Sequence, residues 1–213
     1  MTRLLLVDDD ELVRTGLRMI LDAEPDLEVV AETGDGVEVT SLVTRHAVDV
    51  VLMDVRMPRV DGLAATRHLV ETLPEPPRVL VLTTFGQEEA VYEALRSGAA
   101  GFLVKRSRPE EIVAAVRTVA LGDTLLFPVA IRDLAGRHAP ARRPRLPALT
   151  GREQEVLRHL ARGATNAEIA AALVVGPETV KTHVAAVLGK LGARDRTQAV
   201  VLAYESGFVV PGG

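Results

Sequence analysis

Apolar and polar positions follow two alternating periods over the first 122 residues. Five short apolar runs predict buried strands, because continuous aliphatic stretches of this length are typical of strands covered on both faces. Between these runs, apolar residues recur every three or four positions, as they do on one face of a helix. Strand and helix alternate five times, which predicts a doubly wound α/β fold with a five-stranded parallel sheet. The predicted strands are residues 4–7, 28–31, 50–53, 79–82 and 101–104.

Helix ends in this region carry recognisable signals. Asp10 is a predicted N-cap, since its carboxylate can accept hydrogen bonds from the first free N–H groups of a helix. A second helix is predicted over residues 87–97 and should stop at Gly98, because glycine readily adopts the left-handed conformation that ends helices. The pattern from Ser107 to Glu110 predicts a capping box, with a proline at the first helical position.

Charge divides the chain into two parts. Residues 1–125 carry 13 Lys and Arg against 22 Asp and Glu, whereas residues 141–200 carry 10 against 5. An acidic half joined to a basic half predicts two domains with different partners, nucleic acid among them, although a basic surface is often only solvated. Between the halves Pro, Gly and Arg accumulate, which predicts a partly extended linker with a short helix at 129–134. The predicted domains are 1–122 and 149–213, with the linker at 123–148.

Cysteine is absent from the 213 residues, which excludes disulfides, thiolate metal sites and thiol nucleophiles. This usage is compatible with a reducing cytoplasm. The first apolar run reaches Asp8 too early for a signal peptide, and no apolar run approaches the roughly 18 residues of a membrane span. We therefore expect a cytoplasmic protein without a membrane partner.

Polar side chains gather where the predicted strands end. Asp8 and Asp9 follow the first strand, and Asp54 follows the third. Thr83 follows the fourth strand and Lys105 the fifth. The carboxyl ends of parallel strands share one edge of the sheet, where ligands bind in open α/β folds. Clustered carboxylates need a neutralising cation, and oxygen ligands of this kind suit Mg²⁺. The set could then stabilise phosphoryl transfer to Asp54; the alternative is that Asp54 merely ends a strand.

The acidic pair, the sequence Asp54-Val-Arg-Met-Pro and the sequence Gly-Phe-Leu-Val-Lys105 resemble the receiver domain of bacterial two-component response regulators. The resemblance implies that Asp54 accepts a phosphoryl group from a sensor histidine kinase. It implies that Lys105 pairs with that phosphoryl group. The metal, Mg²⁺ or Mn²⁺, would be held by Asp8, Asp9, Asp54 and the backbone carbonyl of Arg56.

The same resemblance implies a switch beside the acceptor. Thr83 would move toward the phosphoryl group, and Phe102 stands where the family has a Tyr or Phe whose rotamer changes with that threonine. Two alternatives remain for the side chain of Arg56, which would either contact the incoming phosphoryl group or be solvated.

Residues 149–213 are predicted to form an all-α domain of four helices. Thr150 and Glu153 match a capping box that opens the first helix, and Gly163 ends it. Asn166 is the predicted N-cap of a short second helix, and a Gly-Pro break separates that helix from the third. Two short helices divided by such a break predict a helix-turn-helix. The third and fourth helices are predicted over residues 178–191 and 197–206.

The third helix has two unlike sides. One is aliphatic, with Val180, Val184 and Val187, whereas the opposite side, from Glu178 to Gly189, is mostly small. A small-residue face lets a helix enter the major groove, where Lys and Thr can contact phosphates or base edges. The alternative is that this face packs against a neighbouring domain of the chain.

Motifs across residues 149–207 resemble the LuxR-type DNA-binding domain, among them Leu-Thr-Gly-Arg-Glu, Glu-Thr-Val-Lys-Thr-His-Val and Lys-Leu-Gly-Ala-Arg. The full chain therefore resembles a NarL/FixJ-type response regulator. The resemblance implies that the third helix is the recognition helix and that the fourth contributes to a dimer. The residues implied to lie on the DNA side are Thr179, Lys181, Thr182 and Ala185, with His183 packing or contacting a phosphate.

Two places in residues 149–207 depart from the pattern of the LuxR-type domain. Gly176 stands where a serine N-cap is common, which should weaken the start of the third helix by roughly a few tenths of a kcal/mol. Ala185 and Ala186 stand where polar side chains often read bases. Phosphate contacts and DNA shape should therefore carry more of the recognition.

We expect a transcription regulator, not a metabolic enzyme. Phosphorylation would favour a homodimer that binds double-stranded DNA, with RNA polymerase as a further partner. One alternative is a haloacid-dehalogenase-like phosphatase, which the acidic run after the first strand also fits, although the cap and late acidic pair of that family are not visible. The other is an orphan regulator that binds DNA without phosphorylation.

Overall fold

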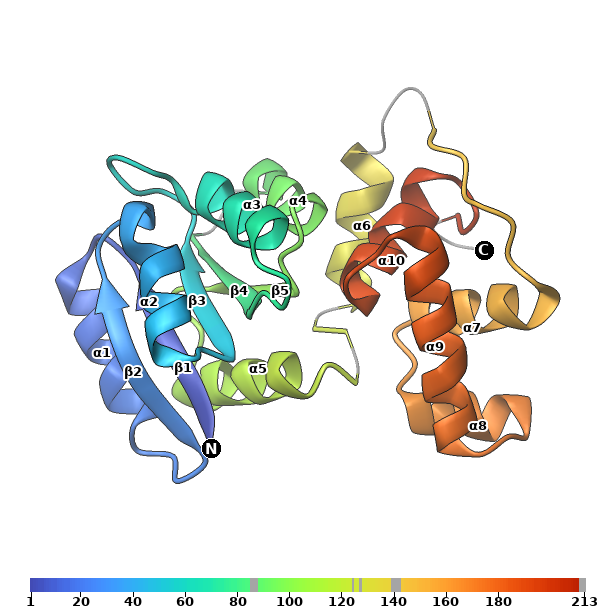
Figure 1. The fold of residues 1–213 in the computed structure, drawn as a ribbon, viewed down its shortest axis with the longest axis horizontal. Coiled ribbons are helices and arrows are strands. Elements are labelled where there is room, and N and C mark those ends of the chain that lie inside the picture. The colour runs from blue at the N-terminus through green and yellow to red at the C-terminus, as the bar shows by residue number, and fades with distance from the viewer. Residues whose placement is uncertain (85–87, 124, 127, 139–142, 211–213) are drawn as a thin grey trace. The chain divides into compact units, whose positions relative to one another are not determined.

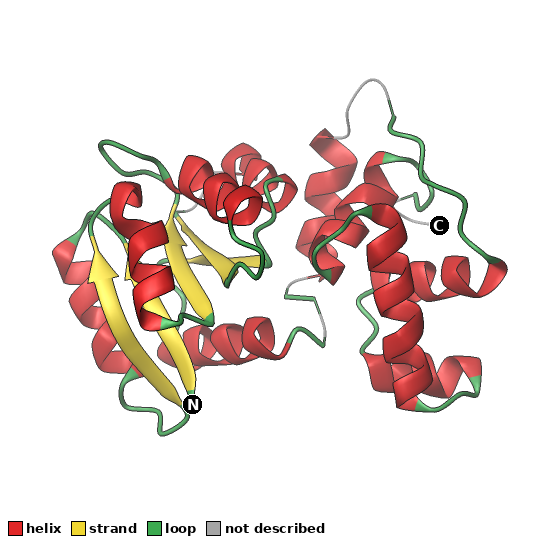
Figure 2. Ribbon diagram, viewed as in Figure 1, coloured by secondary structure: helices red, strands yellow, loops and turns green. Residues whose placement is uncertain are grey.

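The computed structural model describes residues 1–84, 88–123, 125–126, 128–138 and 143–210, and it divides into two compact units, Met1–Ala120 and Leu121–Gly213. The first unit holds all of the strands found in the described residues, and the second is helical (Figure 2).

The first unit is built on a five-stranded parallel sheet in the order β2-β1-β3-β4-β5 (Figure 1). Its helices alternate with its strands, so the predicted doubly wound fold is confirmed. In this strand order the chain switches direction across the sheet between β1 and β3, which is where such folds place their ligand sites. The strands are β1 (Thr2–Val7), β2 (Leu27–Thr33), β3 (Val50–Asp54), β4 (Arg78–Thr83) and β5 (Gly101–Val104).

Helices cover both faces of this sheet. Figure 1 shows α2, α3 and α4 together on one face, with α1 and α5 on the other. Alternate residues of a strand point to opposite faces, so Val51 and Val79 join the core under α2–α4 while Leu82 meets α1 and α5. The helices are α1 (Glu11–Leu21), the short 3₁₀ helix η1 (Gly36–Glu38), α2 (Val39–His46), α3 (Gly62–Thr72), α4 (Glu88–Arg96) and α5 (Pro109–Leu121).

The predicted helix ends are mostly confirmed. Asp10 caps α1, where its carboxylate accepts hydrogen bonds from the N–H groups of Leu12 and Val13. Gly98 follows α4 with a φ of 101°, as expected of a residue that ends a helix. The predicted start of that helix at Gln87 lies outside the described residues.

The capping box predicted from Ser107 to Glu110 is wrong by one position. The helix α5 does begin at proline, but the residue before it is Arg108, whose backbone N–H donates to the Glu111 carboxylate at 3.0 Å. The proline sets the first helical position, so the carboxylate three residues after Arg108 makes the bond.

The second unit contains α6 (Pro128–His138), α7 (Gly151–Ala161), α8 (Asn166–Leu173), α9 (Pro177–Leu191) and α10 (Arg196–Glu205). The helix α6 lies in the predicted linker and is longer than predicted. It buries Ile131 and Leu134 and packs against α10, because these apolar side chains find a partner surface in the same unit. Residues 139–142 of the predicted tether lie outside the described residues.

Capping signals in this unit are confirmed at one helix and corrected at another. Thr150 and Glu153 form the predicted capping box at α7. Asn166, however, is the first residue of α8, and the N-cap is Thr165 in a capping box with Glu168. The reciprocal pair satisfies two N–H groups where an asparagine cap would satisfy one.

Among the described helices, no single one is long and apolar enough to cross a membrane. Only α8 and α9 counted together, which are bent by 107°, meet that test of length and composition.

Candidate functional site

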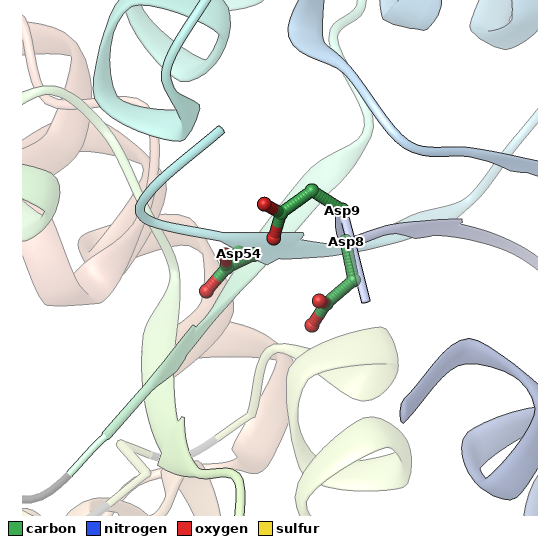
Figure 3. A group of neighbouring side chains, drawn as sticks. All are labelled: Asp8, Asp9 and Asp54. Carbon is green, nitrogen blue, oxygen red and sulfur yellow. The ribbon is translucent and has the colours of Figure 1, made fainter. Parts of the chain in front are cut away.

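Three carboxylates converge at the carboxyl edge of the sheet. Asp8 and Asp9 follow β1, Asp54 ends β3, and one carboxylate oxygen from each lies within 4.8 Å of the others (Figure 3). Asp8 and Asp54 are buried, whereas Asp9 is exposed. Because β1 and β3 are hydrogen-bonded neighbours, their ends bring together residues that are far apart in the sequence.

Lys105 joins two of these carboxylates. Its Nζ lies 2.7 Å from Oδ2 of Asp8 and 3.0 Å from Oδ1 of Asp54. Burial raises the pKa of Asp54; the hydrogen bond from Lys105 opposes this, and the negative charge of Asp8 adds to it. Burial lowers the pKa of Lys105, but its hydrogen bonds to Asp8 and Asp54 outweigh burial and hold that pKa above its ordinary value. The lysine therefore stays charged and offsets the repulsion between the two buried carboxylates.

The three carboxylates form a donor set that fits a hard divalent cation. Oxygen-only ligands with one side open to water are what Mg²⁺ and Mn²⁺ prefer. Asp9 is exposed, so this edge of the site is open to solvent. Arg56 lies two residues after Asp54 on the loop that leaves β3, and its side chain is exposed.

The remaining predicted members of the site lie on β4 and β5. Thr83, the last residue of β4, is buried, and its hydroxyl donates to the carbonyl of Thr84 at 3.1 Å. Phe102 on β5 is partly buried and packs against the core under α2–α4. In the β4–β5 pairing, Phe102 is aligned with Val81 and Thr83 with Val104.

The loop between β3 and α3 is fixed by a buried carboxylate on another loop. Asp35 accepts hydrogen bonds from the backbone N–H groups of Arg59 and Val60, at 3.0 and 3.3 Å, and from that of Val37 at 3.0 Å. Burial raises the pKa of Asp35, but these backbone bonds outweigh it and hold the pKa below its ordinary value. The carbonyl of Val60 in turn accepts from the N–H of Gly36 at 3.2 Å. This clamp fixes the far end of the loop that carries Arg56.

The turn after β1 is held in place by a side chain of α1. The Arg14 guanidinium donates to the backbone carbonyl of Asp8 at 2.6 Å, and it lies 3.5 Å from the Glu32 carboxylate. Because Arg14 stands on α1 and Glu32 on β2, the pair holds the Asp8 backbone between two elements.

Three residues that shape this edge were not predicted from the sequence: Asp35, Arg14 and Gly62, the last of which packs without a side chain against the backbone of Asp54. A signal existed for Asp35, because an Asp-Gly pair shortly after a strand is typical of a turn or a helix cap. Gly62 could be assigned only to a turn. No local pattern marks the contact of Arg14 with Asp8.

A second candidate site lies on α9. Val180, Val184 and Val187 are buried on one side, as predicted, which leaves the opposite side to solvent. The side chains of Thr179, Lys181, Thr182 and Ala185 are exposed, and His183 is half-buried on the flank.

Two of the exposed groups on α9 already have partners on the helix. Lys181 Nζ lies 2.8 Å from Glu178 Oε1, and the Thr182 hydroxyl donates to the Glu178 carbonyl at 3.1 Å. The helix begins after Gly176, which supplies no capping side chain. The solvent-facing side of α9 thus combines small residues with Lys181, whose positive charge is balanced by the neighbouring Glu178 carboxylate.

Two family models match the sequence. Residues 4–117 match the response regulator receiver domain, and residues 147–203 match the luxR family of bacterial regulatory proteins. The chain is 39% identical over 211 residues to the transcriptional regulatory protein LiaR of Bacillus subtilis, which covers 98% of this chain and 100% of LiaR. It is 36% identical over 207 residues to the response regulator protein VraR of Staphylococcus aureus, covering 97% and 98%.

A solved structure is similar along the whole chain. It is that of the response regulator ChrA in a heme-sensing two-component system, with 36% sequence identity and a TM-score of 0.53. The match covers 97% of this chain and 98% of ChrA.

Proposed function

Because this chain belongs to the two-component response regulators that join a receiver domain to a LuxR-type DNA-binding domain, we propose that phosphorylation of Asp54 controls its binding to DNA. The observation that carries the proposal is the convergence of three carboxylates with the Lys105 ammonium at one edge of the sheet. The donor is a phosphohistidine of a sensor histidine kinase. With a sensor kinase and double-stranded DNA as its partners, the chain would act in the cytoplasm.

In the transfer step, a carboxylate oxygen of Asp54 attacks the phosphorus atom. The bond between phosphorus and the imidazole nitrogen of the donor breaks, and the imidazole leaves with the electron pair. Lys105, positioned by Asp8, turns from the Asp54 carboxylate to the transferred phosphoryl oxygens. Asp8, Asp9, Asp54 and the carbonyl of Arg56 would hold Mg²⁺ or Mn²⁺, which when bound supplies positive charge to the phosphoryl oxygens.

The phosphorylated acceptor then shifts a two-state receiver. Thr83 moves to the phosphoryl group, and Phe102 changes its rotamer in the space that the threonine leaves. The receiver, residues 1–122, assists only its own phosphorylation and dephosphorylation. Its altered surface favours a dimer, to which α10 contributes.

In the dimer, the DNA-binding domain at residues 149–213 presents two copies of α9. Two recognition helices meet half-sites about one DNA turn apart. Thr179, Lys181, Thr182 and Ala185 lie on the DNA side, and His183 packs or contacts a phosphate. Bound near a promoter, the dimer has RNA polymerase as a further partner. Residues 123–148 link the two domains, with α6 docked on the second.

Labelling with ³²P-acetyl phosphate and Mg²⁺ tests the acceptor. The wild-type chain should incorporate label, and Asp54→Asn should not. Asp61→Asn is the matched control, because Asp61 lies on the same loop as an exposed N-cap and asparagine caps equally well. Its labelling should equal that of the wild type.

Selecting bound fragments from genomic DNA, with and without phosphorylation, tests the link to DNA. Phosphorylation should raise affinity for the selected fragments, and Asp54→Ala should abolish the increase. An absence of labelling, together with unchanged DNA affinity in Asp54→Ala, would contradict the proposal.

A further inference from the structure

The second unit contains a surface pocket of about 520 Å³ that takes no part in the proposed function. Its walls come from α6, from the end of α7, and from α10 with the residues that follow it; α6 and α10 pack side by side (Figure 1). The volume lies within the roughly 300–1,000 Å³ typical of small-molecule sites. Residues that line it include Val129, Arg132, Arg158, Arg162, Phe208 and Val210.

Positive charge dominates this pocket, because three arginines line it and none of the described lining residues is acidic. Arg132 is paired with the adjacent Asp133, with 3.3 Å between Nε and Oδ1. Among the described residues, the one hydrogen bond of the Arg158 side chain is a long one, 3.4 Å, to the neutral side chain of Gln154. Arg162 is exposed, and within the described residues its side chain makes no hydrogen bond or ion pair. Two of the three charges therefore stand at the pocket without a carboxylate partner in the described part of the chain.

The geometry of Arg158 suits it to an acidic group that offers two oxygen acceptors. Its guanidinium carbon lies 5.0 Å from the centroid of the Phe208 ring, so the aromatic ring supports one face of the group. A guanidinium stacked in this way keeps its edge N–H donors in place for two oxygens of an acidic group, such as a carboxylate or a sulfonate, which it can bind through two parallel bonds.

The rest of the lining is apolar and incompletely covered. Val129 of α6 is 57% exposed, and Val210, in the segment after α10, is 58% exposed; both line the pocket. Tyr204 is buried, and its hydroxyl donates to the carbonyl of Ala161 at 3.1 Å. Its contribution to the pocket lining is therefore its aromatic ring. An apolar body placed between these walls would remove both valines from water.

We propose that this pocket binds a small amphipathic organic anion. Its acidic group pairs with the guanidinium groups of Arg158 and Arg162. Its apolar body lies between Val129 of α6 and the segment Phe208–Val210 that follows α10. Neither a neutral apolar molecule nor a small inorganic anion satisfies both halves of this lining.

Such a ligand would act on the linker helix. One wall of the pocket belongs to α6 and the others to α7 and α10 of the helix-turn-helix region, so a bound molecule holds α6 against those helices. By mass action, binding stabilises the arrangement in which α6 is docked. The arrangement of the second unit would thus respond to a small-molecule ligand, independently of phosphorylation at Asp54.

The test uses the full chain and two related dyes: 8-anilinonaphthalene-1-sulfonate, an apolar anion, and N-phenyl-1-naphthylamine, which lacks the sulfonate. Isothermal titration should give one saturable site for the anion and affinity at least about tenfold weaker for the neutral dye. The double variant Arg158→Ala/Arg162→Ala should lose at least about tenfold in affinity for the anion.

The matched control is Arg145→Ala/Arg194→Ala, which removes the same charge from two exposed positions outside the pocket lining and should bind like the wild type. Val129→Asp leaves the arginines intact but places a carboxylate on the α6 wall, and it should also abolish binding. Equal affinity in the pocket variant and the control variant, or equal binding of the two dyes, overturns the proposal. Circular dichroism of each variant checks that it is folded.

Discussion

A Cβ atom on Gly62 would lie 1.9 Å from the backbone carbonyl oxygen of Asp54. The first residue of α3 therefore packs directly against the backbone of the proposed acceptor, and the Gly62 N–H also donates to the carbonyl of Val55 at 3.0 Å. Only a residue without a side chain allows this approach. The position of Asp54 thus depends on the start of the following helix as well as on its own strand.

Gly62→Ala should destabilise the first unit by about 3 kcal/mol or more, because the new methyl group meets backbone atoms that cannot rotate away. It should also reduce phosphorylation by displacing Asp54. Urea unfolding and acetyl phosphate labelling measure the two effects. Gly16→Ala is the control: a Cβ there meets nothing within 4 Å, and the helix α1 should gain up to about 1 kcal/mol. Equal stability of the two variants would contradict this reading of Gly62.

Asp35→Ala should weaken Mg²⁺ binding about 10- to 100-fold, as expected when a group that positions a metal-binding loop is removed. The N–H groups of Arg59 and Val60 would lose their acceptor, and the loop with Arg56 would no longer be fixed. Titration calorimetry with Mg²⁺ measures the change. Asp35→Asn, which keeps one carbonyl oxygen, should recover part of the affinity.

The control for the Asp35 variant is Asp22→Ala, which also removes a carboxylate that accepts a hydrogen bond from a backbone N–H. Asp22→Ala deprives the N–H of Val29 of its acceptor and lies away from the site, so its Mg²⁺ affinity should match the wild type. If Asp22→Ala weakened Mg²⁺ binding as much as Asp35→Ala, general destabilisation would be the better explanation.

Glu153 should make the stability of α7 depend on pH. The hydrogen bond from Lys190 is the largest cause of its lowered pKa, followed by the N–H of Thr150. Because the folded pKa lies below the unfolded one, this stabilisation is present above the ordinary value of 4.5 and is lost as pH falls through the folded pKa. Urea unfolding of the full chain, followed by NMR signals of α7 at several pH values, should show the loss. Glu153→Gln should remove this part of the pH dependence, whereas Glu155→Gln should retain it.

Gly176→Ser should strengthen the start of α9. The backbone at Gly176 has φ −72° and ψ 152°, which any residue adopts, and a Cβ there would meet only the Thr179 hydroxyl at 3.9 Å. A serine hydroxyl can accept from a free N–H of the first turn, so stability should rise by roughly a few tenths of a kcal/mol. Gly176→Ala adds no acceptor and should fall about 1 kcal/mol below the serine variant in thermal unfolding.

Lys181→Ala should weaken DNA binding about equally for all sequences and should reduce the slope of log affinity against log salt by about one. Glu178→Gln should strengthen binding, because it removes the negative charge that lies 2.8 Å from the lysine and faces the same solvent side. Fluorescence anisotropy across a salt series measures both. A loss confined to one DNA sequence would instead indicate that Lys181 reads a base.

Local patterns determined much of this protein. The aliphatic runs predicted the strands, since a strand buried on both faces needs apolar residues at nearly every position, as in residues 50–53 of β3. Chain order also placed Asp8, Asp54 and Lys105 at strand ends, and parallel strands bring such ends to one edge. The capping box from Thr150 to Glu153 spans only four residues, so no distant contact was needed to predict it.

Only the tertiary structure decided which groups meet. Asp35 reaches Arg59 across 24 residues because two loops lie together beside the sheet, and nothing near either residue encodes that contact. Lys105 bridges Asp8 and Asp54 only when β1, β3, β4 and β5 pair in that order. The helix α6 joins the second unit because α10 offers a surface for its apolar residues. Spacing along the chain determines elements and their ends, but packing determines which of those ends become neighbours.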